Sequence, residues 1–236
     1  MKTILVTGGS KGIGKSLVFQ AAAKNYRVIF TYNKSVKEAK KICKKLKDQC
    51  IGVKVDLSKE VDRGKIFKIL KKKKIKIDCL VNNAAFDVKR KEFNKIKISE
   101  IKKVYEVNVF AIYDLIQKSL KFMKSNKNWC SIINISSTAA KFGGKLYTHY
   151  APTKAAIENL TIGLSRELSK KRVRVLCVAP GVIDTKKENI KNKAIIKSIP
   201  NSRLGSPDEV AKLIIWLASD DAEYINGTSI TISGGR

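Results

Sequence analysis

The sequence predicts an α/β protein, a doubly wound sheet of about seven parallel strands with helices on both faces. Short apolar runs rich in β-branched residues alternate with longer amphipathic runs from one end of the chain to the other. A glycine-rich turn follows the first apolar run directly. Strict alternation of strand and helix favours parallel strands that are covered by helices on both sides. Since no linker or internal repeat interrupts this pattern, we expect residues 1–236 to form a single domain.

The individual elements follow from local patterns in the chain. Short runs rich in Val, Ile, Thr and Tyr are predicted strands, at residues 3–7, 27–32, 51–55, 77–82, 130–136, 173–179 and 228–233. The amphipathic runs between them predict helices, at residues 12–24, 35–47, 59–71, 100–123, 150–170 and 207–219. The last of these helices has a typical start, with Ser206 as N-cap, Pro207 at N1 and Glu209 at N3.

The charge of the chain needs an explanation. A net charge of +29 would suit nucleic acid, an anionic membrane surface or an acidic protein as partner. However, only 8 of the 49 basic residues are arginine, whereas proteins that read nucleic acids usually rely on the bidentate arginine fork. Lysine, isoleucine and asparagine are all abundant, as in proteins from AT-rich genomes. We therefore favour genome composition and solubility, and expect no nucleic-acid partner.

The N-terminal segment and the cysteines favour a cytoplasmic protein, or one in an organelle interior after import. The sequence contains no stretch of about 20 apolar residues, the length needed to span a membrane. The N-terminal apolar run leads directly into the glycine-rich turn, which is typical of a first strand rather than of a signal peptide. The five cysteines are scattered without a CxxC pair, and His149 is the single histidine. We expect reduced structural thiols and no zinc site. A lone histidine is also more often a capping or surface group than a catalyst.

The turn after the first strand predicts a dinucleotide site. Gly8, Gly12 and Gly14 are spaced as GxxxGxG where a strand passes into a helix. Glycine is needed there because the backbone turns tightly and approaches a pyrophosphate, whose charge is stabilised by the helix N-terminus. The residues expected to contact the cofactor in this turn are Gly8, Ser10, Lys11, Gly12, Ile13 and Gly14.

The end of the second strand favours NADP(H) over NAD(H). An acidic residue at this point usually binds the ribose 2′-hydroxyl, but here the chain has Asn33, Lys34 and Ser35. Cations and hydrogen-bond donors, with Lys11 nearby, suit a 2′-phosphate instead. NAD(H) stays open as the alternative, because lysine is abundant throughout this sequence.

Two further strand ends complete the expected cofactor site. Asp56 and Leu57 follow the third strand, and Asp56 could accept a hydrogen bond from an adenine amino group. Alternatively, this stretch begins the next helix, with Ser58 as its N-cap. After the fourth strand, Asn83, Ala84 and Ala85 are small enough to let a cofactor lie across the strand ends.

Two tyrosines share a helical face with one lysine. Tyr150 lies four residues before Lys154, and Tyr147 lies seven residues before it. A neighbouring ammonium favours the phenolate and lowers the pKa of a tyrosine, which can then donate a proton near neutral pH. The spacings alone do not decide which tyrosine does so.

Eight segments in order resemble the short-chain dehydrogenase/reductase family over essentially the whole chain. They read TGGSKGIG, VDLS, NNAA, VNVFA, IINISS, YAPTK, APGVIDT and NGTSITISGG. Within that family the chain most resembles the 3-oxoacyl-(acyl-carrier-protein) reductases. The resemblance implies one NAD(P)-binding Rossmann domain. Ala85 stands where the family usually has glycine, which narrows the space beside the adenosine ribose.

The resemblance also implies roles for the remaining residues. Ser137 lies the thirteen residues before Tyr150 that these reductases show, whereas Ser136 lies fourteen before it, so Tyr150 is expected to be the proton donor. Lys154 would lower its pKa and bind the nicotinamide ribose, Ser137 would hold the carbonyl oxygen, and Asn108 would anchor a proton-relaying water. Tyr147, at a spacing that resembles enoyl reductases, would line the substrate mouth. The residues expected around the nicotinamide are Pro180, Gly181, Ile183 and Thr185.

The expected activity is NADPH-dependent reduction of 3-oxoacyl-[acyl-carrier-protein] to the 3-hydroxyacyl form in fatty acid synthesis. The alternatives are another member of the family, acting on a sugar, polyketide or alcohol, and a non-catalytic basic binding protein. Residues 186–203 resemble the family's substrate lid. The resemblance also implies a homotetramer, or a homodimer, in which the helices at 100–123 and 150–170 pair across one two-fold axis and Trp216 and the last strand lie near another.

Overall fold

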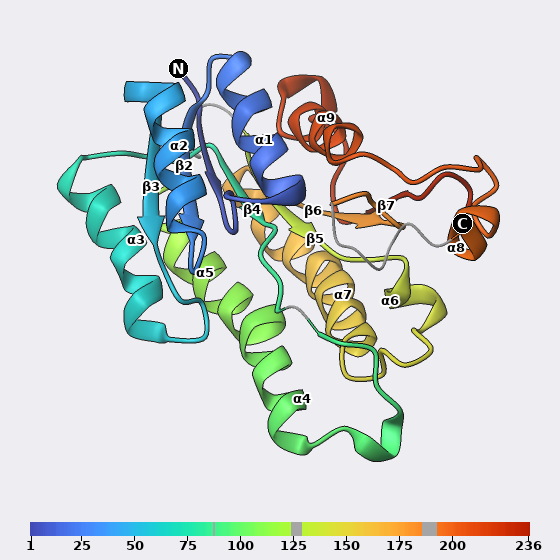
Figure 1. The fold of residues 1–236 in the computed structure, drawn as a ribbon. Coiled ribbons are helices and arrows are strands. Elements are labelled where there is room, and N and C mark those ends of the chain that lie inside the picture. The colour runs from blue at the N-terminus through green and yellow to red at the C-terminus, as the bar shows by residue number, and fades with distance from the viewer. Residues whose placement is uncertain (87, 124–128, 186–192) are drawn as a thin grey trace.

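The computed structural model describes residues 1–86, 88–123, 129–185 and 193–236. Seven parallel strands form one sheet in the order β3-β2-β1-β4-β5-β6-β7 (Figure 1), which confirms the predicted fold class. The strands are β1 (Thr3–Val6), β2 (Arg27–Tyr32), β3 (Cys50–Lys54), β4 (Cys79–Asn82), β5 (Cys130–Ile135), β6 (Val173–Pro180) and β7 (Ser229–Ile232). They match the predicted strands to within two residues at each end.

Helices cover both faces of the sheet (Figure 1). The helices on one face are α1 (Gly12–Ala23), α2 (Val36–Leu46) and α9 (Pro207–Leu217). The helices that pack on the other face are α3 (Glu60–Lys72), α5 (Ala111–Leu120) and α7 (Ala151–Leu168). The shorter helices are α4 (Ile98–Tyr105), which leads toward α5, α6 (Ala139–Phe142) and α8 (Lys193–Lys197).

Each strand is buried on both sides, as expected for a parallel sheet between two helical layers. In β1, the side chains of Ile4 and Val6 lie in the core on the α1 side, and Leu5 lies in the core on the α5 side. This alternation follows from the two-residue period of a strand. The order of the strands reverses between β1 and β4, so the connections leave these two carboxyl ends in opposite directions and open a crevice there.

The structure corrects two of the predicted elements. The helix expected over 100–123 is instead interrupted by a π-helical segment, Glu106–Phe110, between α4 and α5. Ser58 is not an N-cap: Lys59 precedes α3, and Ser58 instead bonds the carboxylate of Asp56. The capping box of α9 is confirmed, because Ser206 and Glu209 each accept a bond from the other's backbone N–H.

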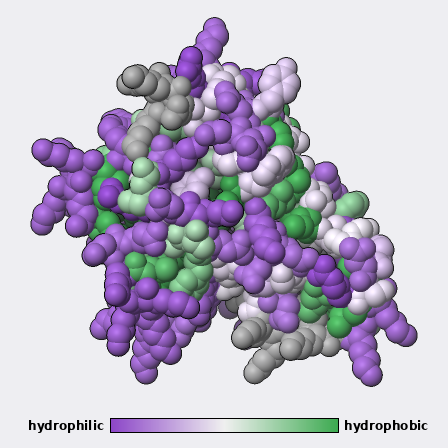
Figure 2. All heavy atoms as spheres, turned by 90° about the horizontal axis from the view of Figure 1, so that it is seen from above, coloured by the Kyte–Doolittle hydropathy of each residue, from purple (hydrophilic) through white to green (hydrophobic). Residues whose placement is uncertain are grey.

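The surface reflects the composition. Hydrophilic side chains cover most of the face seen from above, and smaller hydrophobic patches lie between them (Figure 2). The five cysteines are free thiols, and all but Cys43 are buried. Across the described ranges, no helix combines the length and apolarity needed to cross a membrane.

Candidate active site

The glycine turn forms a cradle with room for an anion and none for a side chain. Gly8 and Gly12 have φ angles of +69° and +50°, the left-handed region that favours glycine. A Cβ at Gly14 would overlap the carbonyl oxygen of Gly8 and lie 2.6 Å from Nδ2 of Asn83. No acidic residue lies in the first turn of α1, whose N-terminus therefore keeps its attraction for a phosphate. Of the predicted contacts in this turn, Lys11 is exposed, Ile13 is half-buried and Ser10 is buried.

Hydrogen bonds join this cradle to the end of β4. The hydroxyl of Thr7 accepts bonds of 3.0 Å from the backbone N–H groups of both Asn83 and Ala84. Nδ2 of Asn83 donates a 2.9 Å bond to the carbonyl of Thr7 in return. Ala85 is exposed, so its methyl group meets no crowding from the described chain. The glycine turn and residues 83–85 thus form one rigid floor, and the residues present fit a dinucleotide.

The end of β2 has an acidic side chain nearby as well as the predicted cation and hydrogen-bond donors. Asn33 and Lys34 are exposed, and the Ser35 side chain makes no capping bond to α2. Sequence reasoning missed Glu38, which lies in the first turn of α2. Its carboxylate forms ion pairs with Lys15 at 3.0 Å and with Lys41 at 3.5 Å. The hydrogen bond from Lys15 holds the pKa of Glu38 below its ordinary value, so the carboxylate stays ionised. Its negative charge is balanced by the two lysines.

A buried arginine, Arg63, hydrogen-bonds the loop that follows β3. Oδ1 of Asp56 accepts bonds from the N–H and hydroxyl of Ser58, which fixes the turn. The carbonyl of Leu57 accepts a 2.6 Å bond from Arg63, whose Nε donates to Asp114 at 2.7 Å. Sequence reasoning missed Arg63, because Asp114 lies 51 residues further along the chain and no local spacing links the two.

The predicted tyrosine and lysine meet at the start of α7. Tyr150 directly precedes this helix, and Nζ of Lys154 lies 5.6 Å from the centre of its ring. The side chain of Lys154 is buried, with 2% exposure, and donates a 2.7 Å bond to the carbonyl of Ile135 at the end of β5. Loss of hydration lowers the pKa of Lys154 to about 8.

The two candidate serines have different surroundings. Ser136 is buried, and its hydroxyl donates a 3.3 Å bond to the carbonyl of Lys154. Ser137 is half-buried, and its hydroxyl accepts a 3.2 Å bond from the N–H of Ala139. Because that bond uses a lone pair, the hydroxyl of Ser137 keeps its proton to donate. The geometry therefore agrees with the choice of Ser137.

Asn108 is bound to two parts of the site through the π-helical segment. It is completely buried; its Oδ1 accepts a 2.8 Å bond from the N–H of Phe86, and its Nδ2 donates a 3.2 Å bond to the hydroxyl of Thr153. Thr153 in turn donates a 2.6 Å bond to the carbonyl of Tyr150. Asn108 thus connects the chain after β4 to the first turn of α7, and Thr153 is a linking residue that sequence reasoning missed.

Tyr147 and His149 lie beside these residues. The ring of Tyr147 is 6.1 Å from that of Tyr150, and the guanidinium of Arg90 stacks 5.4 Å from its centre. The backbone N–H of Lys91 bonds the carbonyl of Leu146 at 2.9 Å, which holds residues 88–91 against this segment. Of the two ordinary roles expected for His149, a capping or a surface group, the surface role is wrong because His149 is buried. Its Nδ1 has no partner within the described ranges.

The segment after β6 returns to the glycine turn. The carbonyl of Pro180 accepts a 3.0 Å bond from Thr138, and the N–H of Gly181 donates a 2.9 Å bond to Ile232. Ile183 pairs with Gly205, and the methyl group of Thr185 lies 3.1 Å from the position a Cβ would take at Gly12. Residues 186–192 of the expected lid lie outside the described residues; 193–203 include α8.

The structure thus brings the predicted residues to one edge of the sheet. Ser137 follows the end of β5, and Tyr150 and Lys154 lie at the start of α7, where Lys154 bonds the carbonyl of Ile135. A phenol, a hydroxyl and a cation grouped in this way can bind an oxygen that gains negative charge and deliver a proton to it. In the part of the chain that the structure describes, no group of three or more His, Cys, Asp and Glu could hold a metal ion.

The chain is similar to known proteins over nearly its whole length. A family model described as enoyl-(acyl carrier protein) reductase matches residues 8–236. The chain is 34% identical over 242 residues to the 3-oxoacyl-[acyl-carrier-protein] reductase of Aquifex aeolicus, covering 99% of this chain and 96% of that one. It is 29% identical over 243 residues to glucose 1-dehydrogenase 2 of Bacillus subtilis, with 99% and 94% covered.

A solved structure shows the same fold. The 3-ketoacyl-(acyl-carrier-protein) reductase of Brucella melitensis, complexed with NADH, superimposes with a TM-score of 0.92 at 28% identity, covering 100% of this chain and 98% of that one. The matches include the glycine turn and the strand ends described above. The chain belongs to the short-chain dehydrogenase/reductase family and is an oxidoreductase that acts on carbonyl or alcohol groups.

Proposed function

We propose that this protein is an NADPH-dependent ketoreductase that converts 3-oxoacyl-[acyl-carrier-protein] to the 3-hydroxyacyl form in fatty acid synthesis. The observation that carries the proposal is that Lys154 lies beside the ring of Tyr150 and bonds the carbonyl of Ile135, two residues before Ser137. The identity of 34% to the Aquifex aeolicus reductase supports the acyl thioester as substrate. A basic surface, with net charge +29, would attract an acidic carrier protein.

The cofactor would lie across the carboxyl ends of β1, β2, β3 and β4. The glycine turn would hold the pyrophosphate, Asn83, Ala84 and Ala85 would lie under the adenosine, and Asp56 would accept a bond from the adenine. Lys34, Asn33, Ser35 and Lys11 would bind the 2′-phosphate, with residues 180–185 around the nicotinamide. When bound, the nicotinamide supplies a hydride to the carbonyl carbon.

The side chains of the protein handle the oxygen and its proton. The hydroxyl of Ser137 donates to the carbonyl oxygen, a bond that strengthens as negative charge develops there. The phenol of Tyr150 transfers its proton to that oxygen. The ammonium of Lys154 favours the phenolate that remains, since opposite charges within about 6 Å stabilise one another. Asn108 and Thr153 fix the first turn of α7, which carries both groups.

Enoyl reduction is the second candidate, because the matching family model carries that description and Tyr147 has the spacing that resembles enoyl reductases. Against it, Ser137 accompanies Tyr150, and the ring of Tyr147 stacks against Arg90. The identity to glucose 1-dehydrogenase 2 keeps another alcohol or sugar as an alternative substrate of the same chemistry.

We also infer a homotetramer. Apolar side chains are exposed on the helices expected to pair, namely Phe110, Tyr113 and Ile162, and Trp216 is exposed on α9. Covering such side chains would stabilise an assembly. A solution mass equal to that of one chain, 26.3 kDa, would contradict this inference.

The test follows the absorbance of NADPH during incubation with an acetoacetyl thioester, carried either on acyl carrier protein or on coenzyme A. NADH, a 2-enoyl thioester and glucose with NADP⁺ are run in parallel. We expect turnover of the acetoacetyl thioester with NADPH, lowered by about 10²- to 10⁴-fold in Tyr150→Phe and retained in Tyr147→Phe. Turnover of the enoyl thioester alone, lost in Tyr147→Phe, would establish the second candidate instead.

A further inference from the structure

A short stretch before α9 supports the segment 182–185 from behind. Gly205 pairs with Ile183 as an isolated parallel bridge. The N–H of Gly205 donates a 3.0 Å bond to the carbonyl of Val182, and its carbonyl accepts a 2.8 Å bond from the N–H of Asp184. Both backbone groups of Gly205 are therefore used to fix one segment.

Gly205 fits this place because it lacks a side chain. A Cβ added to it would lie 2.6 Å from Cδ1 of Ile183, inside van der Waals contact. On the far side of the segment, Thr185 lies against Gly12 of the glycine turn. The segment is thus enclosed between the phosphate cradle and Gly205, and the position of Gly205 determines how far it stands from the cradle.

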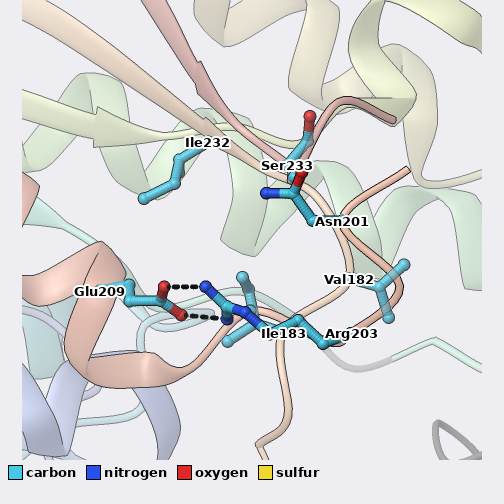
Figure 3. A pocket seen from close by; sticks show the side chains of 9 residues that line it. Val182, Ile183, Asn201, Arg203, Glu209, Ile232 and Ser233 are labelled. Carbon is cyan, nitrogen blue, oxygen red and sulfur yellow. Dashed lines mark hydrogen bonds and ion pairs between the residues drawn. The ribbon is translucent and has the colours of Figure 1, made fainter. Parts of the chain in front are cut away.

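An ion pair fixes the residues on both sides of Gly205. Arg203 donates to the two carboxylate oxygens of Glu209 at 2.9 and 2.6 Å, and also to the carbonyl of Leu204 at 3.1 Å. The same carboxylate accepts a 2.8 Å bond from the N–H of Ser206. Figure 3 shows the two parallel bonds of this pair. Both side chains of the pair line a hollow of about 140 Å³, together with Val182 and Ile183.

The ion pair between Arg203 and Glu209 is partly exposed to solvent. The side chains of Arg203 and Glu209 are 58% and 38% exposed, and isolated surface ion pairs contribute only about 0–1 kcal/mol to stability. Even so, the bond from Arg203 lowers the pKa of Glu209 to about 2. Such a pair contributes little to folding. Its bidentate geometry instead fixes the backbone groups on both sides of Gly205.

We propose that Arg203 and Glu209 are positioning residues for the nicotinamide, acting through Gly205 on the segment 182–185. This inference rests on the proposed function in one respect, namely that the segment contacts the nicotinamide. Displacements of about 1 Å in a site of this kind can lower a rate by about 100-fold. The pair would therefore affect the nicotinamide half of the cofactor and leave the adenosine half unaffected.

The first test variant is Arg203→Met, which keeps the apolar stem and removes the fork. Its matched control is Asp220→Asn, which breaks the exposed 2.6 Å ion pair between Lys2 and Asp220 away from the site. We measure dissociation constants for NADPH and for 2′,5′-ADP, which lacks the nicotinamide, together with kcat and the transfer of deuterium from NADPH labelled at either face of C4.

We expect Arg203→Met to lower kcat by about 10- to 100-fold, to weaken NADPH and not 2′,5′-ADP, and to transfer some label from the wrong face. Glu209→Gln, which retains its capping bond, should show a smaller effect in the same direction. Equal weakening of both nucleotides, or unchanged kcat and label transfer, would overturn the proposal. If Arg203→Met does not fold, Gly205→Ala decides by the same readouts, because its methyl group must displace Ile183.

Failure of the proposed function gives a different result. If the unmodified protein reduces no ketone, the comparison of NADPH with 2′,5′-ADP still tests the positioning role, because binding needs no substrate. Should it prefer NADH, the pair NADH and ADP replaces the two probes. Unequal weakening in Arg203→Met would then support positioning of the nicotinamide even for another reaction.

Discussion

Lys154 is a buried cation that faces Tyr150 across 5.6 Å and is hydrogen-bonded by the carbonyl of Ile135 at 2.7 Å. Within the described ranges, no carboxylate forms an ion pair with it. The backbone carbonyl is a neutral acceptor and only partly replaces the lost hydration. Burying the charge of Lys154 therefore has a free energy cost that no ion pair within the described ranges offsets. This cost lowers the pKa of Lys154.

The first prediction concerns activity against pH. Since the pKa of Lys154 is about 8, we expect kcat/KM for reduction to fall as pH rises through this value, because the cation that supports Tyr150 is lost. A guanidinium stays charged throughout this range. In Lys154→Arg the fall should therefore move to higher pH, even where the absolute rate is lower. An unmoved fall in that variant would assign it to another group.

The second prediction concerns stability. Below pH 8 both the folded and the unfolded chain hold Lys154 charged, and the folded state carries the full cost of burial. Between about 8 and the ordinary 10.5, the unfolded state binds more protons, so the free energy of unfolding rises with pH. One pKa unit corresponds to about 1.4 kcal/mol, so the total cost is on the order of 3 kcal/mol.

Lys154→Met removes this titration. Denaturant unfolding of both proteins should show that the stability of the variant relative to the unmodified chain is greatest below pH 8 and declines by up to about 3 kcal/mol by pH 10.5. The lost bond to Ile135 does not depend on pH, so it shifts the curve without changing its shape. A constant difference between the two proteins would show that Lys154 titrates as it does in water.

Patterns within short stretches of sequence predicted the fold and supplied the candidate site residues. The alternation of apolar runs predicted the seven strands, and the spacing of Ser137 and Tyr150 chose between two serines and two tyrosines. The structure separates the two serines by burial, whereas both tyrosines are half-buried. These features are local, or depend on the fixed geometry of one strand end beside one helix. Sequence is informative at that range.

Features that depend on distant segments could not be predicted in this way. The π-helical segment adds one residue to a turn without disturbing the apolar pattern, so residues 100–123 read as one helix. Arg63 finds Asp114 and Leu57 only after α3 and α5 have packed together. The burial of His149 and Lys154 was equally hidden, because charged and polar side chains give no periodic signal of an interior position.

The third prediction concerns the choice of nicotinamide cofactor. Lys34 is exposed at the end of β2, and a charge-assisted bond to a phosphate contributes about 1.5–3 kcal/mol. Lys34→Glu should therefore lower kcat/KM for NADPH by about 10- to 100-fold and leave that for NADH nearly unchanged. Lys40→Glu, the same change further along α2, is the control. Equal losses with both cofactors would show that Lys34 does not contact a 2′-phosphate.

The last prediction concerns the link between Asn108 and α7. Asn108→Leu keeps similar volume but leaves the N–H of Phe86 without its acceptor, and an unsatisfied buried group costs about 1–3 kcal/mol. It also removes the bond that the hydroxyl of Thr153 accepts, while the bond from Thr153 to the carbonyl of Tyr150 remains. Thr153→Val is nearly isosteric and removes the bond to the carbonyl of Tyr150. The same change removes the acceptor of the Asn108 Nδ2 bond, so each variant affects two partners, and both should lower the free energy of unfolding.

Activity separates positioning from stability in this pair. If the link holds Tyr150 in place, both variants should lower kcat for the acetoacetyl thioester. The dissociation constant of 2′,5′-ADP should stay the same, since the adenosine half is proposed to bind at other strands. Ser119→Ala supplies the comparison, because Ser119 is buried in α5 and its hydroxyl has no partner within the described ranges, so its removal should change neither quantity. Normal kcat in Thr153→Val would mean that α7 holds Tyr150 in place without this link.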